Sequence, residues 1–254
     1  MQYDLDTLRE RHSVRKYSDR AVPAAEIGQL RDLVAELNRT YKGVRFSLVV
    51  NDGETFNSFK RTYGMISGVK NYLVAVADTT VADSEEIAGF CGEAFVMAAT
   101  AMGLGTCFVG ATYNPATVKI ILSASEEIAF LVPFGYENED GPGFLGKLVS
   151  KITHRKSILP EDFYDNSLGF FNLQEALERM PALRDALEAL AAAPSGMNKQ
   201  PARIWMGEDT MLHLGVAFKG DYTSIDLGIA KFNVQAVIPG KWEWGAGGAL
   251  LSEA

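Results

Sequence analysis

Apolar residues recur along the chain with different spacings, and each spacing predicts a different element. After Pro23, apolar residues follow one another at intervals of three and four, as on one face of an amphipathic helix: Ile27, Leu30, Val34 and Leu37. Residues Asn71–Asp78 are apolar almost without interruption, which is typical of a strand covered on both faces. From Ser84 the chain is apolar or small on nearly every helical face, so we expect a long buried helix that ends at Gly103.

The same reasoning predicts the remaining elements. Short apolar runs bounded by turn residues indicate strands at Arg45–Val50, Thr106–Ala111, Glu127–Tyr136, Arg203–Met206 and Met211–Phe218. Helical patterns cover Asn172–Ala193 and Thr223–Ile238. The second of these helices is largely apolar and has an acidic residue, Asp226, in its first turn.

The order of elements repeats itself. Leu30-Arg31-Asp32 recurs as Leu183-Arg184-Asp185, and each copy leads through a polar turn and two strands to a buried helix. In those buried helices, Gly92-x-Ala94 aligns with Gly228-x-Ala230. We therefore expect two tandem halves, 1–160 and 161–254, of which the second is a shortened copy; two unrelated α/β halves are the alternative.

Composition narrows the class of protein. The 254 residues carry a net charge of −8, which argues against nucleic acid or an anionic membrane as a partner. No apolar run approaches the roughly 20 residues of a bilayer span, and the charged start does not resemble a secretory signal, so we expect a cytoplasmic protein. Cys91 and Cys107 have neither metal-ligand nor disulfide spacing, so both are expected to be buried, and no metal site is expected.

Two segments in the first half are candidates for binding. In Arg11–Tyr17 the polar donors Arg11, Ser13 and Arg15 alternate, so they can point the same way and meet a phosphate group. In Ala101–Ala111 glycines allow a flat ligand to approach the backbone. These glycines follow a helix and precede a strand, which is opposite to a dinucleotide-binding turn. Taken singly, the segments could also be a solvated basic face and a helix cap.

Two further segments lie later in the chain. Thr153–Ser157 is a compact basic patch, and Ala193–Pro201 is a turn rich in hydrogen-bond donors and acceptors. The amides of Asn198 and Gln200 suit the uracil-like edge of a flavin. A basic linker and a plain polar loop are the alternative interpretations.

Taken together, these motifs resemble the FMN-dependent nitroreductase family. The resemblance rests on RHSVRKY, GLGTCFVG, VPFGY, HRK and APSGMNKQP, and it touches most of the chain. In the ordinary family the last motif follows the first helix, whereas here it follows the matching helix of the second half. The chain is thus similar to the single-chain TM nitroreductases, in which two tandem halves mimic the family homodimer. The implied fold is α+β, with a central mixed or antiparallel sheet flanked by helices.

The resemblance also implies a site. The first half would supply the FMN phosphate and isoalloxazine contacts, the second half the APSGMNKQP loop, and a backbone N–H near Gly110 would face flavin N5. The implied cofactor-binding residues are Arg11, His12, Ser13, Arg15, Phe108, Val109, Gly110, Ala111, Arg155, Lys156, Pro194, Ser195, Asn198 and Gln200. No catalytic side chain is expected, because the flavin itself performs the chemistry.

The implied activity is transfer of hydride from NAD(P)H through FMN N5 to a small oxidised acceptor, such as a nitroaromatic compound or a quinone. One FMN per chain is expected, with no partner subunit needed to complete the site. The alternative is an FMN-binding storage or sensor protein with little turnover, in which Trp242 and Trp244 would cover the flavin. A plainer role for both tryptophans is to cap the core.

Overall fold

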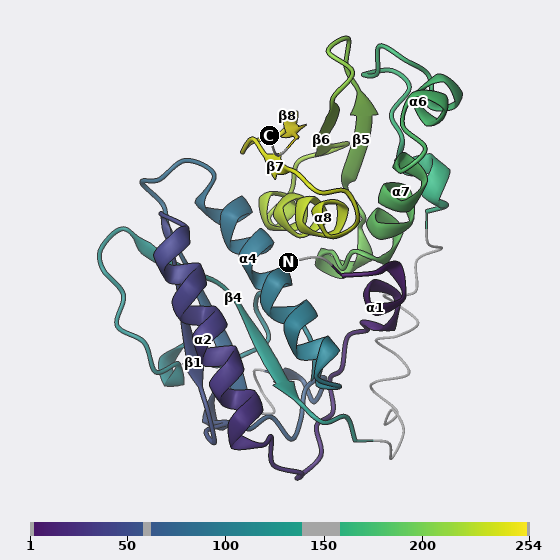
Figure 1. Ribbon diagram of the computed structural model, residues 1–254. Coiled ribbons are helices and arrows are strands. Elements are labelled where there is room, and N and C mark those ends of the chain that lie inside the picture. The colour runs from purple at the N-terminus through teal and green to yellow at the C-terminus, as the bar shows by residue number, and fades with distance from the viewer. Residues whose placement is uncertain (1–2, 58–61, 139–157, 253–254) are drawn as a thin grey trace. The chain divides into compact units, whose positions relative to one another are not determined.

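The structure of the protein, a computed structural model, describes residues 3–57, 62–138 and 158–252 (Figure 1). It divides into two compact units. Of the described residues, those between Glu10 and Ser84 and between Phe95 and Asn138 make up the first-sheet unit, and the second-sheet unit consists of Tyr3–Arg9, Glu85–Ala94 and Ile158–Ser252. Each unit is made of segments that alternate along the chain. The boundary predicted at residue 160 is a different division, between the two tandem halves, and it stays a prediction.

The first-sheet unit is built on a four-stranded antiparallel sheet in the order β1-β2-β4-β3. Its elements are α2 (Ala24–Thr40), β1 (Val44–Val49), η1 (Glu54–Phe56), β2 (Asn71–Asp78), the second part of α4 (Ser84–Ala101), β3 (Gly105–Thr106), η2 (Pro115–Thr117) and β4 (Glu126–Gly135). The predicted bounds of β2 are confirmed, and β1 and β4 each begin and end one residue earlier than predicted.

Burial follows the predicted pattern in this unit. All four apolar positions predicted for the face of α2 are buried, and the helix begins directly after Pro23. Strand β2 is buried from Asn71 to Ala77, as expected for a central strand covered on both faces. The start of α4 at Ser84 is confirmed, and Gly103 follows its end with a positive φ of 73°.

The strand predicted at Thr106–Ala111 is wrong in extent, because regular pairing of β3 stops at Thr106. Gly105 pairs with Gly135, and Val109 pairs with Leu131 in the same antiparallel register. In that register Cys107 would oppose Pro133. Proline has no backbone N–H, so this hydrogen-bonded pair cannot form and the ladder is interrupted.

The second-sheet unit contains a second four-stranded antiparallel sheet, in the order β5-β6-β8-β7. Its elements are α1 (Leu5–Glu10), the first part of α4, η3 (Pro160–Phe163), α6 (Leu173–Arg179), α7 (Leu183–Ala192), η4 (Gly196–Asn198), β5 (Ala202–Met206), β6 (Leu212–Val216), α8 (Thr223–Val237), β7 (Lys241–Trp242) and β8 (Gly248–Leu251). The predicted strands in β5 and β6 and the predicted helix α8 are confirmed.

The single helix predicted at Asn172–Ala193 is wrong, since the chain forms two helices there. The first, α6, begins with a capping box between Asn172 and Glu175 and ends at Arg179. Pro181 then stands between α6 and α7. A proline inside a helix removes a backbone donor and clashes with the preceding turn, which explains the break.

The two tandem halves are visible in the topology. Each runs helix, strand, strand, helix, strand, strand, from α2 to β4 and from α7 to β8, and each sheet orders its strands first-second-fourth-third. The fold is therefore α+β with two antiparallel sheets. In the second-sheet unit, a Cβ on Gly89 would overlap the Ile225 carbonyl oxygen, and one on Gly228 the Glu86 carbonyl oxygen. In this reciprocal crossing of α4 and α8, Gly89 and Gly228 occupy corresponding places. The sequence alignment of Gly92 with Gly228 stays a prediction.

Other expectations concern membranes, cysteines and metals. In the part of the chain that the structure describes, no helix combines the length and apolarity required to cross a bilayer. Both cysteines are unpaired and buried, as predicted. Among the same described residues, no three His, Cys, Asp or Glu side chains gather as metal ligands would.

Candidate functional site

The basic segment Arg11–Tyr17 is extended and held on both sides within the first-sheet unit. Ser13 bridges to Thr106 in β3, and the Val14 N–H donates to the Thr106 carbonyl oxygen at 2.8 Å. On the other side, the Tyr17 N–H donates to the Ser67 carbonyl at 3.0 Å, and the Ser67 N–H donates to the Arg15 carbonyl at 3.0 Å. The backbone of this segment is therefore fixed by its neighbours.

Two apolar anchors determine which way the segment faces. Val14 and Tyr17 are only 1% and 5% exposed. The Tyr17 hydroxyl lies 2.8 Å from the Val14 carbonyl oxygen and 3.0 Å from that of Pro133. A Cβ on Gly105 would lie 2.5 Å from Val14 Cγ2, so the glycine allows this close approach. Because alternate residues of an extended chain face opposite ways, the burial of Val14 directs its neighbours to the other side.

The three donors that the sequence singled out all influence the pKa of one buried thiol. Burial raises the pKa of Cys107, while the Arg15 guanidinium, a hydrogen bond with the Ser13 side chain and the Arg11 guanidinium each lower it. Arg11, Ser13 and Arg15 are themselves partly exposed. The bridge between Ser13 and Thr106 places this segment, with its alternating donors, beside the start of the glycine-rich segment.

His12 has other partners. Its Nε2 lies 2.9 Å from Glu137 Oε2, and its Nδ1 lies 3.1 Å from the Glu10 carbonyl oxygen. The hydrogen bond to Glu137, and then the one to Glu10, raises the pKa of His12. Since both ring nitrogens face acceptors, the protonated ring satisfies both contacts. A direct role of His12 toward a phosphate stays a prediction.

The glycine-rich segment presents backbone on the side away from the sheet. Val109 exchanges two hydrogen bonds with Leu131 in β4, at 2.8 and 2.9 Å. Residues that flank such a pair turn their N–H groups away from the partner strand, so the Gly110 N–H points away from β4. Gly110 and Ala111 are exposed, and the Phe108 ring packs against Phe130 with centroids 5.0 Å apart.

The Ala193–Pro201 loop, which belongs to the second-sheet unit, is tightly wound. Met197, Asn198 and Gln200 have positive φ angles of 51°, 51° and 47°, which is uncommon for residues other than glycine. The Gln200 N–H donates to Ser195 Oγ at 2.9 Å, and the Ile158 N–H donates to Gln200 Oε1 at 3.2 Å. The polar side-chain atoms of Ser195 and Gln200 thus already hold the loop together.

Asp226 is a participant that sequence reasoning noted only as an acid in the first turn of α8. Its Oδ1 accepts a hydrogen bond from the Gly196 N–H at 2.9 Å. Burial raises the pKa of Asp226 to about 6, against the opposing effects of the Gly196 N–H and of Lys199. The only signal in the sequence was an acid between apolar residues, which marks a helix start equally well.

Two predicted residues, Arg155 and Lys156, lie outside the described residues. Their part in a phosphate site stays a prediction. The same holds for the expectation, drawn from the resemblance, that the Ala193–Pro201 loop contacts the same flavin as Arg11–Arg15.

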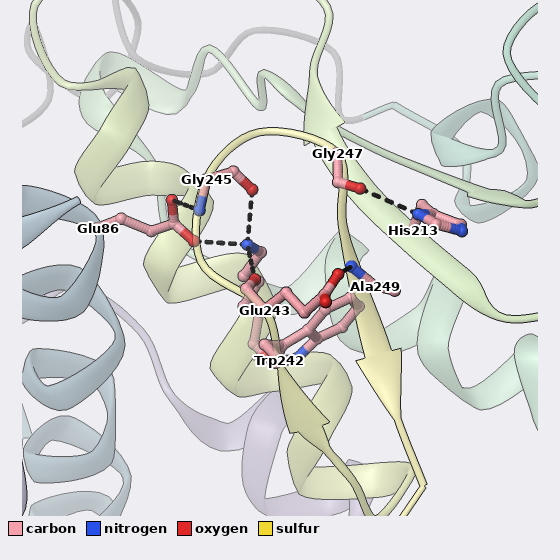
Figure 2. A network of polar contacts seen from close by, with 8 residues as sticks. Glu86, His213, Trp242, Glu243, Gly245, Gly247 and Ala249 are labelled. Carbon is pink, nitrogen blue, oxygen red and sulfur yellow. Dashed lines mark hydrogen bonds and ion pairs between the residues drawn. The ribbon is translucent and has the colours of Figure 1, made fainter. Parts of the chain in front are cut away.

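Sequence reasoning missed a buried ion pair in the second-sheet unit, drawn in Figure 2. Lys231 Nζ in α8 lies 2.5 Å from Glu86 Oε1 in α4, and it donates to the carbonyl oxygens of Glu243 and Gly245 at 2.8 and 2.9 Å. The Gly245 N–H donates to Glu86 Oε2 at 2.9 Å. We call these four residues the α4–α8 clasp. A lone lysine in a largely apolar helix was its only sequence signal.

The clasp also explains the two C-terminal tryptophans. The Trp242 Nε1–H donates to the Lys231 carbonyl oxygen at 2.8 Å, and the residue is 3% exposed. Trp244 packs edge-on against Phe90 with centroids 5.5 Å apart. Both side chains thus contribute to the core of the second-sheet unit, in line with their plainer role.

Comparison with known families identifies the relationship. The family described as "Putative TM nitroreductase" matches residues 5–238. The chain belongs to this family. No curated protein matches the chain.

Among the solved structures that are similar to this chain, one supports the assignment of the fold. A structure from Thermotoga maritima MSB8, described as "a putative nitroreductase", is 20% identical with a TM-score of 0.60, over 93% of this chain and 84% of that one. An FMN-dependent nitroreductase from Clostridium difficile R20291 is 19% identical with a TM-score of 0.42, over 60% and 98% of the two chains. A structure from Desulfovibrio desulfuricans, described as "a putative nitroreductase in complex with fmn", is 20% identical with a TM-score of 0.43, over 56% and 91% of the two chains.

Proposed function

We propose that the protein binds one FMN per chain and works as an NAD(P)H-dependent oxidoreductase that reduces a small oxidised acceptor, such as a nitroaromatic compound or a quinone. The observation that carries the proposal is the extended segment Arg11–Tyr17 beside β3, in which Val14 and Tyr17 are buried and the alternating donors Arg11, Ser13 and Arg15 are partly exposed. Membership of a nitroreductase family agrees with it.

The chemistry of these donors fits the phosphate of a flavin mononucleotide. Two guanidinium groups and a hydroxyl supply charge-assisted hydrogen bonds to a phosphate, and guanidinium groups match its oxygens well. The chain as a whole carries a net charge of −8, so the cationic cluster runs against the general charge of the protein. The buried anchors Val14 and Tyr17 hold the donors in place without a ligand, which reduces the entropy lost on binding.

The residues of the chain would divide the work of binding. Arg11 and Arg15 would neutralise the phosphate, and Ser13 would donate its hydroxyl proton to a phosphate oxygen. The Gly110 N–H, directed away from β4, would donate to the edge of the flavin ring, with Phe108 beside it. When bound, FMN supplies the redox chemistry, so no side chain is needed as a nucleophile or a base.

Binding of FMN is the first test. Protein freed of ligand is titrated with FMN and followed by flavin absorbance and fluorescence, for the wild type, Arg15→Ala and the control Arg39→Ala. Arg39 is exposed in the last turn of α2. We expect one FMN per chain, a loss of about tenfold or more in affinity for Arg15→Ala, and no change for Arg39→Ala. A wild type that takes up no flavin refutes the proposal.

Turnover is the second test, and it separates an enzyme from a storage or sensor protein. The loaded protein is mixed with NADH and with NADPH without oxygen, and the loss of flavin absorbance is followed in a stopped-flow instrument. An oxidoreductase bleaches rapidly with at least one donor and recovers its colour when a quinone or a nitroaromatic compound is added. Slow bleaching with both donors would favour the storage or sensor alternative.

A further inference from the structure

The outer edge of β1 has no neighbouring strand among the residues that the structure describes. At the other edge of the same sheet, Ser13 bridges to β3. In the second-sheet unit the edge strand β5 is covered, since the Asp165 N–H donates to the Ile204 carbonyl oxygen at 2.9 Å and the Phe170 N–H to that of Met206 at 3.0 Å. The opposite edge strand, β7, has only two residues. With six residues, β1 is the long edge that another strand could join.

Alternate residues of β1 direct their backbone groups away from β2. The Asp78 N–H donates to the Gly43 carbonyl oxygen at 2.9 Å, and the antiparallel register continues from there along the whole of β1. The residues between hydrogen-bonded positions of an antiparallel pair turn their N–H and C=O groups outward. Val44, Phe46 and Leu48 therefore form the outer edge.

One side chain occupies the middle of this edge. The Phe46 N–H donates to Asn38 Oδ1 at 2.7 Å, and Asn38 Nδ2 donates to the Phe46 carbonyl oxygen at 2.9 Å. A residue of a neighbouring antiparallel strand would exchange the same two bonds. Asn38 lies in the last turn of α2, the helix that packs beside β1 (Figure 1). Its amide thus takes the place of a strand residue at the centre of the edge.

The second half closes the equivalent edge in another way. Asn38 lies eight residues after Leu30, and Ala191 lies eight residues after Leu183, the counterpart of Leu30 in the repeat. Alanine has no side-chain amide, and in that half the backbone of residues 164–170 covers β5 instead. The amide is therefore a device of the half whose first strand is left uncovered.

A second copy of β1 is a strand that fits this edge. Antiparallel pairing about a twofold axis at Phe46 places Val44 opposite Leu48 of the other copy, so that apolar residues meet. It also places Arg45, the one charged residue of the strand, opposite Ser47. Like charges would destabilise such a pair, and here none face each other. The side chains along β1 do not oppose pairing, so the obstacle is the amide on Phe46.

We propose that the edge of β1 is a site for strand addition, that the strand it fits is β1 of a second copy of this chain, and that the Asn38 amide keeps the site closed. Removal of the amide releases the N–H and C=O of Phe46 at the centre of the edge. Two chains then pair as identical antiparallel strands, in which the outward groups of one β1 meet those of the other. FMN plays no part in this pairing, so its test is independent of the proposed function.

The first test measures association. The masses of the wild type, Asn38→Ala and the control Arg39→Ala are determined by analytical ultracentrifugation at rising protein concentration. Arg39 is the exposed neighbour of Asn38 in α2. We expect Asn38→Ala to rise from the mass of one chain toward that of two, while the wild type and Arg39→Ala stay at one. Equal masses of all three proteins at every concentration overturn the inference.

A second substitution separates strand pairing from general aggregation. Val44 is the first residue of β1 and its N–H points away from β2, a position at which a folded sheet tolerates proline. Proline there removes a donor that the added strand needs, so Asn38→Ala combined with Val44→Pro should return to the mass of one chain. Dimers that persist in the double variant, or growth of Asn38→Ala beyond two chains, contradict pairing along β1.

Hydrogen exchange locates the change on the strand. In the wild type, the Phe46 amide should exchange slowly, and the outward amides of Val44 and Leu48 should exchange fast. In dilute Asn38→Ala, Phe46 should exchange about tenfold faster or more, because its acceptor is lost. At high concentration of this variant, pairing should slow all three amides. Fast exchange of Phe46 in the wild type, or unchanged exchange in the dilute variant, refutes the closing role of Asn38.

Discussion

The buried carboxylate of Asp226 should make the protein less stable at neutral pH than in mild acid, and Asp226→Asn should remove that effect. Burial raises the pKa of Asp226 from 3.8 to about 6. The folded protein then holds this proton more tightly than the unfolded chain. The free energy of unfolding therefore falls as the pH rises from about 4 to about 6, and the loss is complete above that range. A difference of about two pH units corresponds to about 3 kcal/mol.

The assay is urea unfolding of the wild type and Asp226→Asn at pH values from 4 to 8, with the exposed Asp221→Asn as control. Asparagine keeps an acceptor for the Gly196 N–H, so the two proteins should be nearly equal in stability at pH 4. By pH 7.5 the variant should be more stable by about 3 kcal/mol. Comparing differences between variants cancels the titration of all other groups. A difference that stays flat across this range refutes the reasoning.

The remaining predictions concern packing and ion pairs. Lys231→Met should lower the free energy of urea unfolding by about 3–5 kcal/mol, because it leaves the buried Glu86 carboxylate unpaired. Adding Glu86→Leu should restore only part of the loss, since the backbone partners of the α4–α8 clasp stay unsatisfied. Gly228→Ala should cost about 2 kcal/mol or more in the same assay, because its methyl group overlaps the Glu86 carbonyl oxygen; an unchanged midpoint would show that the helices can separate freely. Arg45→Ala should cost less than about 1 kcal/mol at pH 7, because the pair is partly exposed. Arg45 is the main cause that lowers the pKa of Glu126 from 4.5 to about 2, so this small difference should be present at neutral pH and vanish as the pH falls toward 2.

Local patterns predicted most elements because the decisive interactions are local or periodic. Strand β2 follows from an uninterrupted apolar run, and α2 from its apolar stripe. Both corrections involve proline. The apolar periodicity of a helix continues on both sides of Pro181, so the pattern alone predicts one helix. The proline divides it into two. Pro133 lies in β4 and interrupts the hydrogen-bond ladder of the strand opposite. The apolar pattern of one strand does not reveal which residues of the partner strand it faces.

In the candidate site, too, residues that follow a local pattern were predicted, and contacts between residues distant in the sequence were not. Alternation of Arg11, Ser13 and Arg15 predicted that they share one side of the segment, and the structure adds the buried residues Val14 and Tyr17 that anchor it. The bonds of Asp226 to Gly196 and of Lys231 to Glu86 join residues far apart in the sequence. A single sequence marks such residues only as charges in apolar surroundings and does not name their partners.

The crossing of α4 and α8 connects the duplication with the clasp. Gly89 packs on the carbonyl oxygen of Ile225, three residues before Gly228, and Gly228 packs on that of Glu86, three residues before Gly89. Two copies of one helix related by a twofold axis make such a reciprocal contact, and here two halves of one chain make it.

The same correspondence shows where the halves have diverged. It matches Glu86 with Ile225, and it matches Lys231, three residues after Gly228, with Gly92, three residues after Gly89. At the position equivalent to each charged residue of the clasp, the other half therefore has an uncharged residue. An identical pair of helices would carry both charges twice or not at all, so the clasp distinguishes the two halves. Because its lysine also binds the Glu243 and Gly245 carbonyl oxygens, this asymmetry fixes the turn between β7 and β8, which has no counterpart at β3 and β4.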